Sequence, residues 1–346
     1  MIKEIAPEEF LELRQHLPVI DVRSPGEFIL GHIPNAHNVY LFNDEERAQV
    51  GTKYKQAGRE PAVFLGLELI GPQIAAKILQ AKNISNKELL IHCWRGGMRS
   101  QSMAWAFNLI GIDCHVLLGG YKAYRAHIRQ SFEKKALIVI LGGMTGTGKS
   151  EYLRALNERG FQALDLEKLA NHKGSSFGAI GQAQQPSNEQ FENDLFDHWQ
   201  QVDFSCPLLI EDESQAIGKV GIPNPLYLQM RSAPVIKLEI SREERIKRLV
   251  AEYATTELQS LKDAVYRIKD KLGGLSTKMA QDAIDAKDFS TATDLLLNYY
   301  DKTYEHGLSK RRSPVSPLLL NDVRTDKRLD RIADMIEDLF SDTVGP

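Results

Sequence analysis

The sequence predicts an α/β protein built from two successive parallel-sheet domains. Short apolar runs alternate with helical stretches as far as Ser241, and beyond it the pattern is long, charged and helical. Two glycine-rich loops each follow an apolar run and open a helical stretch. Strands that alternate with helices are typical of parallel sheets. We therefore expect a first domain over residues 5–130 and a second over 136–346, in which residues 241–346 form a helical C-terminal extension.

In the first domain we expect three strands and two helices. The apolar runs 17–22, 88–92 and 114–118 are the predicted strands. One predicted helix covers 72–81, where Pro72 takes the favoured first position. The other covers 100–110 and ends at Gly111. The charged stretch 125–135 is expected to be a connecting helix or linker.

The second domain starts with an apolar strand over 136–141, which feeds a glycine loop and a helix over 150–158. Three more strands are predicted, at 161–166, 207–210 and 235–240. Buried strands of a parallel sheet are apolar on both faces, and these runs have that character.

Composition indicates a soluble globular protein of the cytoplasm. The 346 residues are 42% hydrophobic and 26% charged, with a formal net charge of −3, so any nucleic-acid site must be a local basic patch. We expect no membrane-spanning segment, because no apolar run approaches the roughly 20 residues that a span needs, and no signal peptide. Three cysteines provide neither a disulfide framework nor a paired metal motif, which favours a reducing compartment.

The first glycine loop, Ile91–Ser100, is built around a thiol. Cys93 ends an apolar strand and precedes a helix, so backbone N–H groups and the helix N-terminus should stabilise a thiolate. Cys93 is therefore the candidate nucleophile. The residues expected to hold an oxyanion or chalcogen around it are Trp94, Arg95, Gly96, Gly97, Met98 and Arg99.

The second loop satisfies the pattern G-x4-G-K-[ST] and predicts a diphosphate or triphosphate site. Lys149 neutralises phosphate charge, Ser150 can ligate Mg²⁺, and glycines let backbone N–H groups approach the ligand. The expected diphosphate-binding residues are Gly143, Thr145, Gly146, Thr147, Gly148, Lys149 and Ser150. A surrounding phosphate or Mg²⁺ site is expected from Asp165, Glu211, Asp212 and Arg231, with Arg242 and Arg245 as further arginines. The pattern leaves the base or tail of the ligand, and the metal, undetermined.

The first domain resembles the rhodanese family. The resemblance lies in the segments Asp21–Phe28 and Gly31–Asn38, and it places Cys93 where that family forms a persulfide. The loop from Cys93 to Arg99 is one residue longer than is usual in sulfurtransferase rhodaneses. The same spelling fits cysteine-dependent phosphatases, so the loop alone leaves phosphatase and chalcogen transferase both open. The implied fold is a rhodanese-like domain followed by a P-loop NTPase-like α/β domain.

Over nearly its full length the chain resembles the tRNA 2-selenouridine synthase family. The segments that carry the resemblance, besides the two loops, are Gly51–Gly58, Gly119–Arg125, Asn171–Ser175 and Glu211–Ser214. The resemblance implies a transferase that converts wobble 2-thiouridine of lysine, glutamate and glutamine tRNAs into 2-selenouridine through an S-geranyl intermediate. Its substrates would be geranyl diphosphate and selenophosphate, the latter supplied by selenophosphate synthase. No tightly bound cofactor is implied, and Mg²⁺ is a candidate ion.

Two surfaces follow from this implied activity. A geranyl chain needs an apolar groove, for which the candidates are Phe177, Phe191, Leu195 and Trp199. The tRNA needs cations, for which the candidates are Lys53, Lys55, Arg59, Lys122 and Arg125.

Two other functions compete with this one. The first is a bifunctional phosphatase–kinase, in which Cys93 hydrolyses phosphate esters and Lys149 binds ATP. We find no convincing aspartate to act as the general acid of such a phosphatase. The second is a binding module that uses the P-loop as a nucleotide switch, against which the intact Cys93 and Lys149 argue.

Overall fold

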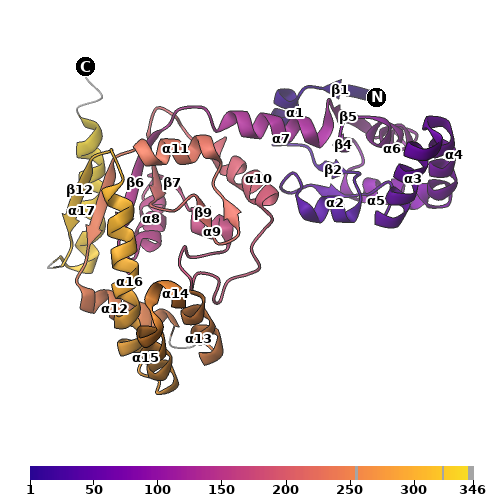
Figure 1. The fold of residues 1–346 in the computed structure, drawn as a ribbon. Helices are drawn as coiled ribbons and strands as arrows, with labels where there is room; N and C mark the ends of the chain where they lie inside the picture. The colour runs from indigo at the N-terminus through magenta and orange to yellow at the C-terminus, as the bar shows by residue number, and fades with distance from the viewer. Residues whose placement is uncertain (254–255, 322, 342–346) are drawn as a thin grey trace. The chain divides into compact units, whose positions relative to one another are not determined.

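The computed structural model describes residues 1–253, 256–321 and 323–341, and its chain forms two compact units (Figure 1). The first unit comprises residues 1–131 together with 192–197. The second comprises residues 132–191 and the chain from 198 onward.

The first unit is built on a five-stranded parallel sheet of order β1-β5-β4-β2-β3. Its strands are β1 Ile2–Ile5, β2 Val19–Asp21, β3 His37–Asn38, β4 Glu88–His92 and β5 Asp113–Leu117. The three predicted strands correspond to β2, β4 and β5. Because β4 is central and its last four residues are buried, it has the continuous apolar sequence of a parallel-sheet strand.

Seven α-helices surround this sheet in the described residues. They are α1 Pro7–Leu13, α2 Pro25–Leu30, α3 Asp44–Ala57, α4 Arg59–Ile70, α5 Ile74–Ile84, α6 Met98–Asn108 and α7 Gly120–Ser131. The predicted helix at 72–81 is α5, but Pro72 lies in a 3₁₀ turn, Gly71–Gln73, that precedes it. Of the stretch 125–135, expected to be a connecting helix or linker, residues 125–131 are helical and form the second half of α7.

One apolar run in the first unit corrects the expectation that no segment approaches a membrane span. By length and composition, the helical stretch Arg59–Ile84 is apolar enough to cross a membrane. In the fold it consists of α4, the 3₁₀ turn and α5, and it buries Ala62, Ile70 and Ala81 against the domain. A single stretch of this kind is weak evidence for a span, because core helices of globular domains can be equally long and apolar.

The second unit is built on a parallel sheet of order β12-β11-β6-β8-β7. Its strands are β6 Leu137–Gly143, β7 Gln162–Leu164, β8 Pro207–Glu211, β11 Val235–Glu239 and β12 Val315–Leu319. A small hairpin pairs β9 Ala216–Ile217 with β10 Val220–Gly221. The four predicted strands of this domain are β6, β7, β8 and β11.

The remaining helices lie in or enter the second unit. They are α8 Lys149–Glu158, α9 Leu166–Ala170, α10 Asn188–Trp199, α11 Asn224–Ser232, α12 Arg242–Tyr253, α13 Leu258–Arg267, α14 Lys269–Leu272, α15 Gly274–Asp285, α16 Phe289–Ser309 and α17 Thr325–Ser341. Helices α8 and α17 pack on the sheet through Leu153, Leu156, Ile332 and Ile336. Helices α13, α15 and α16 form a separate apolar cluster with Phe177.

The region 241–346 is not purely helical, which corrects the predicted extension. Within it β12 adds an edge strand that pairs in parallel with β11. Pro317 lies inside this strand, and proline is tolerated in sheets chiefly at edges. The two prolines at 314 and 317 explain why the sequence did not indicate a strand here.

Candidate active sites

The thiol of Cys93 lies directly after β4, buried with 3% exposure, where the chain turns into α6. The Ser100 hydroxyl donates a hydrogen bond to its sulfur at 3.3 Å. Burial raises the pKa of the Cys93 thiol. The hydrogen bonds from the Ser100 hydroxyl and from the backbone N–H groups of Arg95 and Ser100, with the charge of Arg99, more than offset burial and hold that pKa below its ordinary value. The geometry therefore stabilises a thiolate, as the loop sequence predicts.

The first turn of α7 holds the thiol loop in place. The backbone N–H of Tyr121 donates to the carbonyl of Cys93 at 2.8 Å, and that of Lys122 donates to the carbonyl of Trp94 at 3.0 Å. Gly120 has φ of +60°, and a Cβ there would lie 2.4 Å from both the Cys93 oxygen and the Gly96 nitrogen. Only glycine fits so close an approach. The Gly119–Arg125 segment thus supports the loop that carries the nucleophile.

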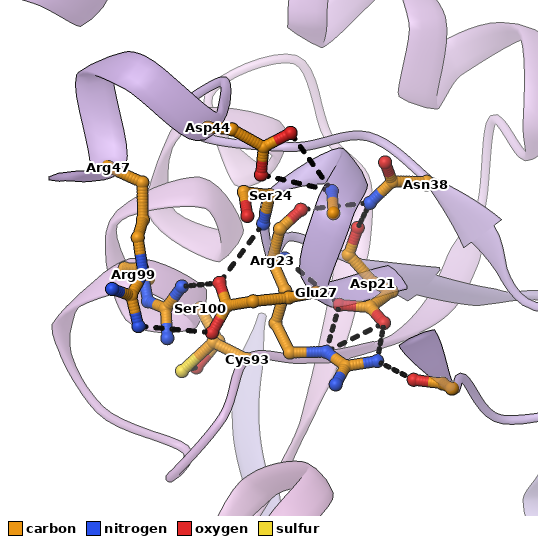
Figure 2. Close-up of polar contacts among 12 residues, drawn as sticks. Asp21, Arg23, Ser24, Glu27, Asn38, Asp44, Arg47, Cys93, Arg99 and Ser100 are labelled. Atoms are coloured by element: carbon orange, nitrogen blue, oxygen red, sulfur yellow. Dashed lines mark hydrogen bonds and ion pairs between the residues drawn. The ribbon is translucent and has the colours of Figure 1, made fainter. Parts of the chain in front are cut away.

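The two arginines of the thiol loop have different roles. Arg95 is exposed, whereas Arg99 donates to Glu27 at 2.7 Å (Figure 2). Glu27 also receives the backbone N–H of Ser24 and lies 3.5 Å from Arg47. Half of the loop's expected positive charge is therefore already paired. Sequence analysis missed Glu27, although its position three residues after Ser24 is the signature of a capping box.

A buried ion pair supports the strand ends beneath this loop. The Arg23 guanidinium bonds Asp21 at 2.6 Å and lies 3.8 Å from the centre of the Tyr121 ring. His92 is 3.8 Å from Asp21, and burial lowers the pKa of His92 to about 4. At neutral pH His92 is uncharged, so it adds no charge to the buried Asp21–Arg23 pair.

The P-loop closes on itself at the end of β6. Gly146 and Gly148 adopt φ of +85° and +81°. The Lys149 ammonium donates to the carbonyl of Gly143 at 2.8 Å, which holds the lysine over its own loop. The N–H of Gly143 donates to the Tyr304 hydroxyl of α16 at 2.7 Å. The loop thus has the sharp turns that its glycines predict, and α16 supports it from one side.

Three carboxylates meet beside the P-loop serine. The Ser150 hydroxyl lies 2.6 Å from Glu211 and 2.8 Å from Glu167. Carboxylate oxygens of Glu167, Glu211 and Glu213 all lie within 4.8 Å of one another. Burial, followed by the charge of Glu167, raises the pKa of Glu213 to about 8 and that of Glu211 well above its ordinary value.

This acid cluster fits a hard divalent cation. Oxygen donors suit Mg²⁺, and one oxygen of Glu211, Oε1, is buried without any hydrogen-bond partner. Glu167, Glu211, Glu213 and Ser150 would hold the ion, which would neutralise charge on a bound diphosphate. We therefore name these four residues as the candidate Mg²⁺ site.

Several residues of the predicted phosphate or Mg²⁺ site make other contacts in the fold. Asp212 pairs with Arg311, and Asp165 caps α9 and lies 3.3 Å from Arg154. Arg231 donates to the Gly307 carbonyl at 3.3 Å. Of the predicted set only Glu211 belongs to the acid cluster, whose other acids are Glu167 and Glu213.

Of the further arginines, Arg245 supports the P-loop directly. It donates to the Thr145 carbonyl at 3.2 Å and pairs with Asp301 of α16 at 2.8 Å. Arg242 pairs with Asp294 at 2.6 Å.

An apolar pocket adjoins the P-loop. It is bounded by Thr145 of the loop, by Ser175 and Phe177, and by side chains of α12, α13, α15 and α16. Most of the residues that line it are apolar, with Thr145, Ser175, Thr293 and Tyr300 among the polar exceptions. Of the four residues expected to form an apolar groove, Phe177 lines the pocket. The other three, Phe191, Leu195 and Trp199, are at most 1% exposed and do not line it.

The predicted tRNA contacts are only partly available. Lys53, Lys55, Arg59 and Lys122 are exposed. Arg125 is buried with 5% exposure, and it donates to Asn193 at 2.6 Å and pairs with Glu192. A buried, paired guanidinium is not placed to contact a phosphate backbone, so Arg125 is removed from the set.

The fold and the two loops define a class of protein: a rhodanese-like domain with a stabilised thiolate, joined to a P-loop domain with an apolar pocket. Residues 6–127 match the rhodanese-like domain family, and residues 136–324 match the family described as the tRNA 2-selenouridine synthase AAA domain. A protein of Shewanella denitrificans named tRNA 2-selenouridine synthase is 36% identical, aligned over 91% of this chain and 95% of its own length. The chain belongs to the tRNA 2-selenouridine synthase family.

A second relative of the same name agrees. It comes from Proteus mirabilis, is 36% identical, and is aligned over 88% of this chain and 92% of its own length. Among solved structures, the N-terminal domain of a putative ATP/GTP binding protein from Clostridium difficile 630 is 36% identical. It covers 36% of this chain and 98% of its own, with a TM-score of 0.35.

Proposed function

We propose that this protein converts wobble 2-thiouridine of tRNA into 2-selenouridine, by geranyl transfer in the P-loop domain followed by selenium transfer at Cys93. The observation that carries the proposal is the apolar pocket beside the P-loop, bounded by Thr145 of the loop and Phe177. A nucleotide needs a site for its base and ribose, whereas a prenyl diphosphate needs an apolar pocket next to a phosphate-binding loop. The combination favours the prenyl donor over ATP.

In the first step the thiocarbonyl sulfur of the uridine attacks the allylic carbon of geranyl diphosphate. A carbon–sulfur bond forms, the carbon–oxygen bond breaks, and diphosphate leaves with the electron pair. Lys149, the loop N–H groups and a cation at Glu167, Glu211 and Glu213 would stabilise that leaving group. Alkylation turns the sulfur into a good leaving group for the second step.

In the second step selenium from selenophosphate replaces the geranylthio group. The Cys93 thiolate attacks phosphorus, the phosphorus–selenium bond breaks, and selenide is released to attack C2 of the base. Geranylthiolate then leaves, and water cleaves the phosphocysteine to phosphate. The N–H groups of Arg95 and Ser100, which stabilise the thiolate, would also bind the phosphoryl oxygens.

The tRNA itself would be held by exposed cations of the first unit. Lys53, Lys55 and Arg59 lie at the end of α3 and the start of α4, and Lys122 lies on α7. Contacts of this kind make affinity fall steeply with salt.

The test is mass spectrometry of wobble nucleosides made by purified variants from 2-thiouridine tRNA, without ATP. Cys93→Ala should accumulate S-geranyl-2-thiouridine and form no 2-selenouridine, whereas Lys149→Ala should form neither. Supplying S-geranyl tRNA should restore selenation in Lys149→Ala but not in Cys93→Ala.

Cys206→Ala and Lys168→Ala, both at exposed positions, are the matched controls and should behave like the unaltered protein. Normal 2-selenouridine from Cys93→Ala, or geranylation that requires ATP, would contradict the proposal. The second outcome would favour the phosphatase–kinase reading instead.

A further inference from the structure

We propose that the far end of the apolar pocket, formed by Phe289 and Ala292 on α16, sets the length of the prenyl chain that the enzyme accepts. This inference rests on the proposed geranyl transfer and adds a specificity determinant to it. It follows from the direction in which the pocket runs and from the residues that end it.

Helix α16 supplies six of the residues that line the pocket, so the axis of this helix gives the pocket its direction. Near its C-terminal end, the Tyr304 hydroxyl accepts the N–H of Gly143, and Asp301 pairs with the arginine that holds Thr145. These contacts fix that end of the helix at the P-loop. The N-terminal end, which starts at Phe289, lies fifteen residues from Tyr304 and so points away from the phosphate site.

The pocket residues of α16 recur along one side of the helix. They are Tyr300, Leu297, Leu296, Thr293, Ala292 and Phe289, in order of increasing distance from the P-loop. Tyr300 and Phe289 are separated by eleven positions, which is about 16 Å at 1.5 Å per residue. A chain anchored by its diphosphate at Lys149 would therefore extend along α16 toward Phe289.

The two ends of the pocket differ in chemistry. Near the P-loop the lining includes the polar side chains of Thr145, Ser175 and Tyr300. The two α16 lining residues farthest along the helix from the P-loop, Ala292 and Phe289, are both apolar. An apolar tail that extends along α16 would thus end against these two side chains, and their size would decide how long the tail can be.

Phe289 and Ala292 are a matched pair for testing this end. They are three positions apart on α16, so their side chains are neighbours on one helix face. Phe289 presents a half-buried ring, and Ala292 is a small residue with 3% exposure. Removing the ring should lengthen the pocket, and adding a ring at 292 should shorten it.

The experiment measures kcat/KM for transfer from dimethylallyl, geranyl and farnesyl diphosphates to 2-thiouridine tRNA. Phe289→Ala should raise the ratio of farnesyl to geranyl transfer at least about tenfold, in the range that pocket-size changes achieve. Ala292→Phe should move the preference the other way, raising the ratio of dimethylallyl to geranyl transfer by a similar factor. Leu275→Ala, at a 75% exposed position of α15 that is not part of the lining, should change neither ratio.

The outcomes separate the two proposals. If the unaltered protein transfers no prenyl group from any of the three donors, the proposed function itself fails. If it transfers geranyl and neither variant changes the ratios, the far end is elsewhere and only this inference fails. Because Phe289→Ala creates a cavity, Phe289→Leu is measured alongside it, and a folded Phe289→Leu with an unchanged ratio counts equally against the inference.

Discussion

The acid cluster beside Ser150 makes the stability of the second unit depend on pH in a direction that can be worked out. The pKa of Glu213 is about 8 in the fold and 4.5 ordinarily, chiefly because of burial and the nearby charge of Glu167. Between these values the folded protein binds a proton that the unfolded chain has released. Stability is therefore fully present below pH 4.5 and declines as pH rises toward 8.

The size of this effect follows from the two pKa values. From pH 4.5 to pH 7.5 the ionisation of Glu213 lowers the free energy of unfolding by at most about 4 kcal/mol, at roughly 1.36 kcal/mol per pH unit. Glu213 is only half-buried, and its neighbouring carboxylates share the proton. We therefore expect the free energy of unfolding to fall by about 2 kcal/mol. Glu213→Gln, which cannot ionise, should therefore be about 2 kcal/mol more stable than the unaltered protein at pH 7.5 in EDTA, and equally stable at pH 4.5.

Urea unfolding followed by the fluorescence of Trp199 measures this in the second unit. The chain has three tryptophans, so a Trp94→Phe, Trp105→Phe background leaves Trp199 as the only one. Mg²⁺ should stabilise the Glu213 protein at pH 7.5 and have much less effect on Glu213→Gln. If Glu213→Gln were no more stable than the unaltered protein at pH 7.5, the three carboxylates would not repel one another in the fold, and the reasoning would be refuted.

Two further predictions concern the thiol loop. Ser100→Ala removes a hydrogen bond to the Cys93 sulfur, so the pH profile of iodoacetamide labelling should move to higher pH. Ser102→Ala, exposed on the same helix, should leave the profile in place, and an unmoved profile for Ser100→Ala would exclude the hydroxyl as a stabiliser. Gly120→Ala should destabilise the first unit by about 2–4 kcal/mol in urea unfolding, since the new Cβ would lie 2.4 Å from backbone atoms at a positive φ. The control is Gly97→Ala, because a Cβ at Gly97 would have nothing within 4 Å. If the Gly120→Ala and Gly97→Ala variants were equally stable, the backbone at Gly120 would rearrange at little cost.

The sequence predicted best the elements whose signal is local. Central strands such as β4 are buried along most of their length, so they appear as continuous apolar runs. Both glycine loops were found because strand, loop and helix follow one another within a few residues. The edges were missed: three of the four residues of β1 are exposed, and β12 contains a proline. Helix α3 buries no residue, so it has no apolar stripe to detect.

The parts of the site that depend on tertiary packing could not be predicted in this way. Glu167, Glu211 and Glu213 converge because β7 and β8 are neighbours in the sheet, which spacing along the chain does not reveal. The apolar pocket draws on α12, α13, α15 and α16, and no single helix carries its pattern. Arg125 shows the opposite error, since a basic residue in a charged stretch proved to be buried and paired.

Strand β12 also bears on how the protein is made. Synthesis is vectorial, and at the ribosome a chain emerges at roughly 5–20 residues per second. Until residues 315–319 emerge, β11 is an uncovered sheet edge, although Ile236 and Leu238 must end up buried. The last helix, α17, supplies Ile332 and Ile336 to the core of the same sheet. The P-loop is translated long before residues 315–319, yet the sheet that holds it is complete only once β12 has paired with β11. A nascent chain that stalls before residue 315 therefore exposes an unpaired, apolar sheet edge, which chaperones would need to cover.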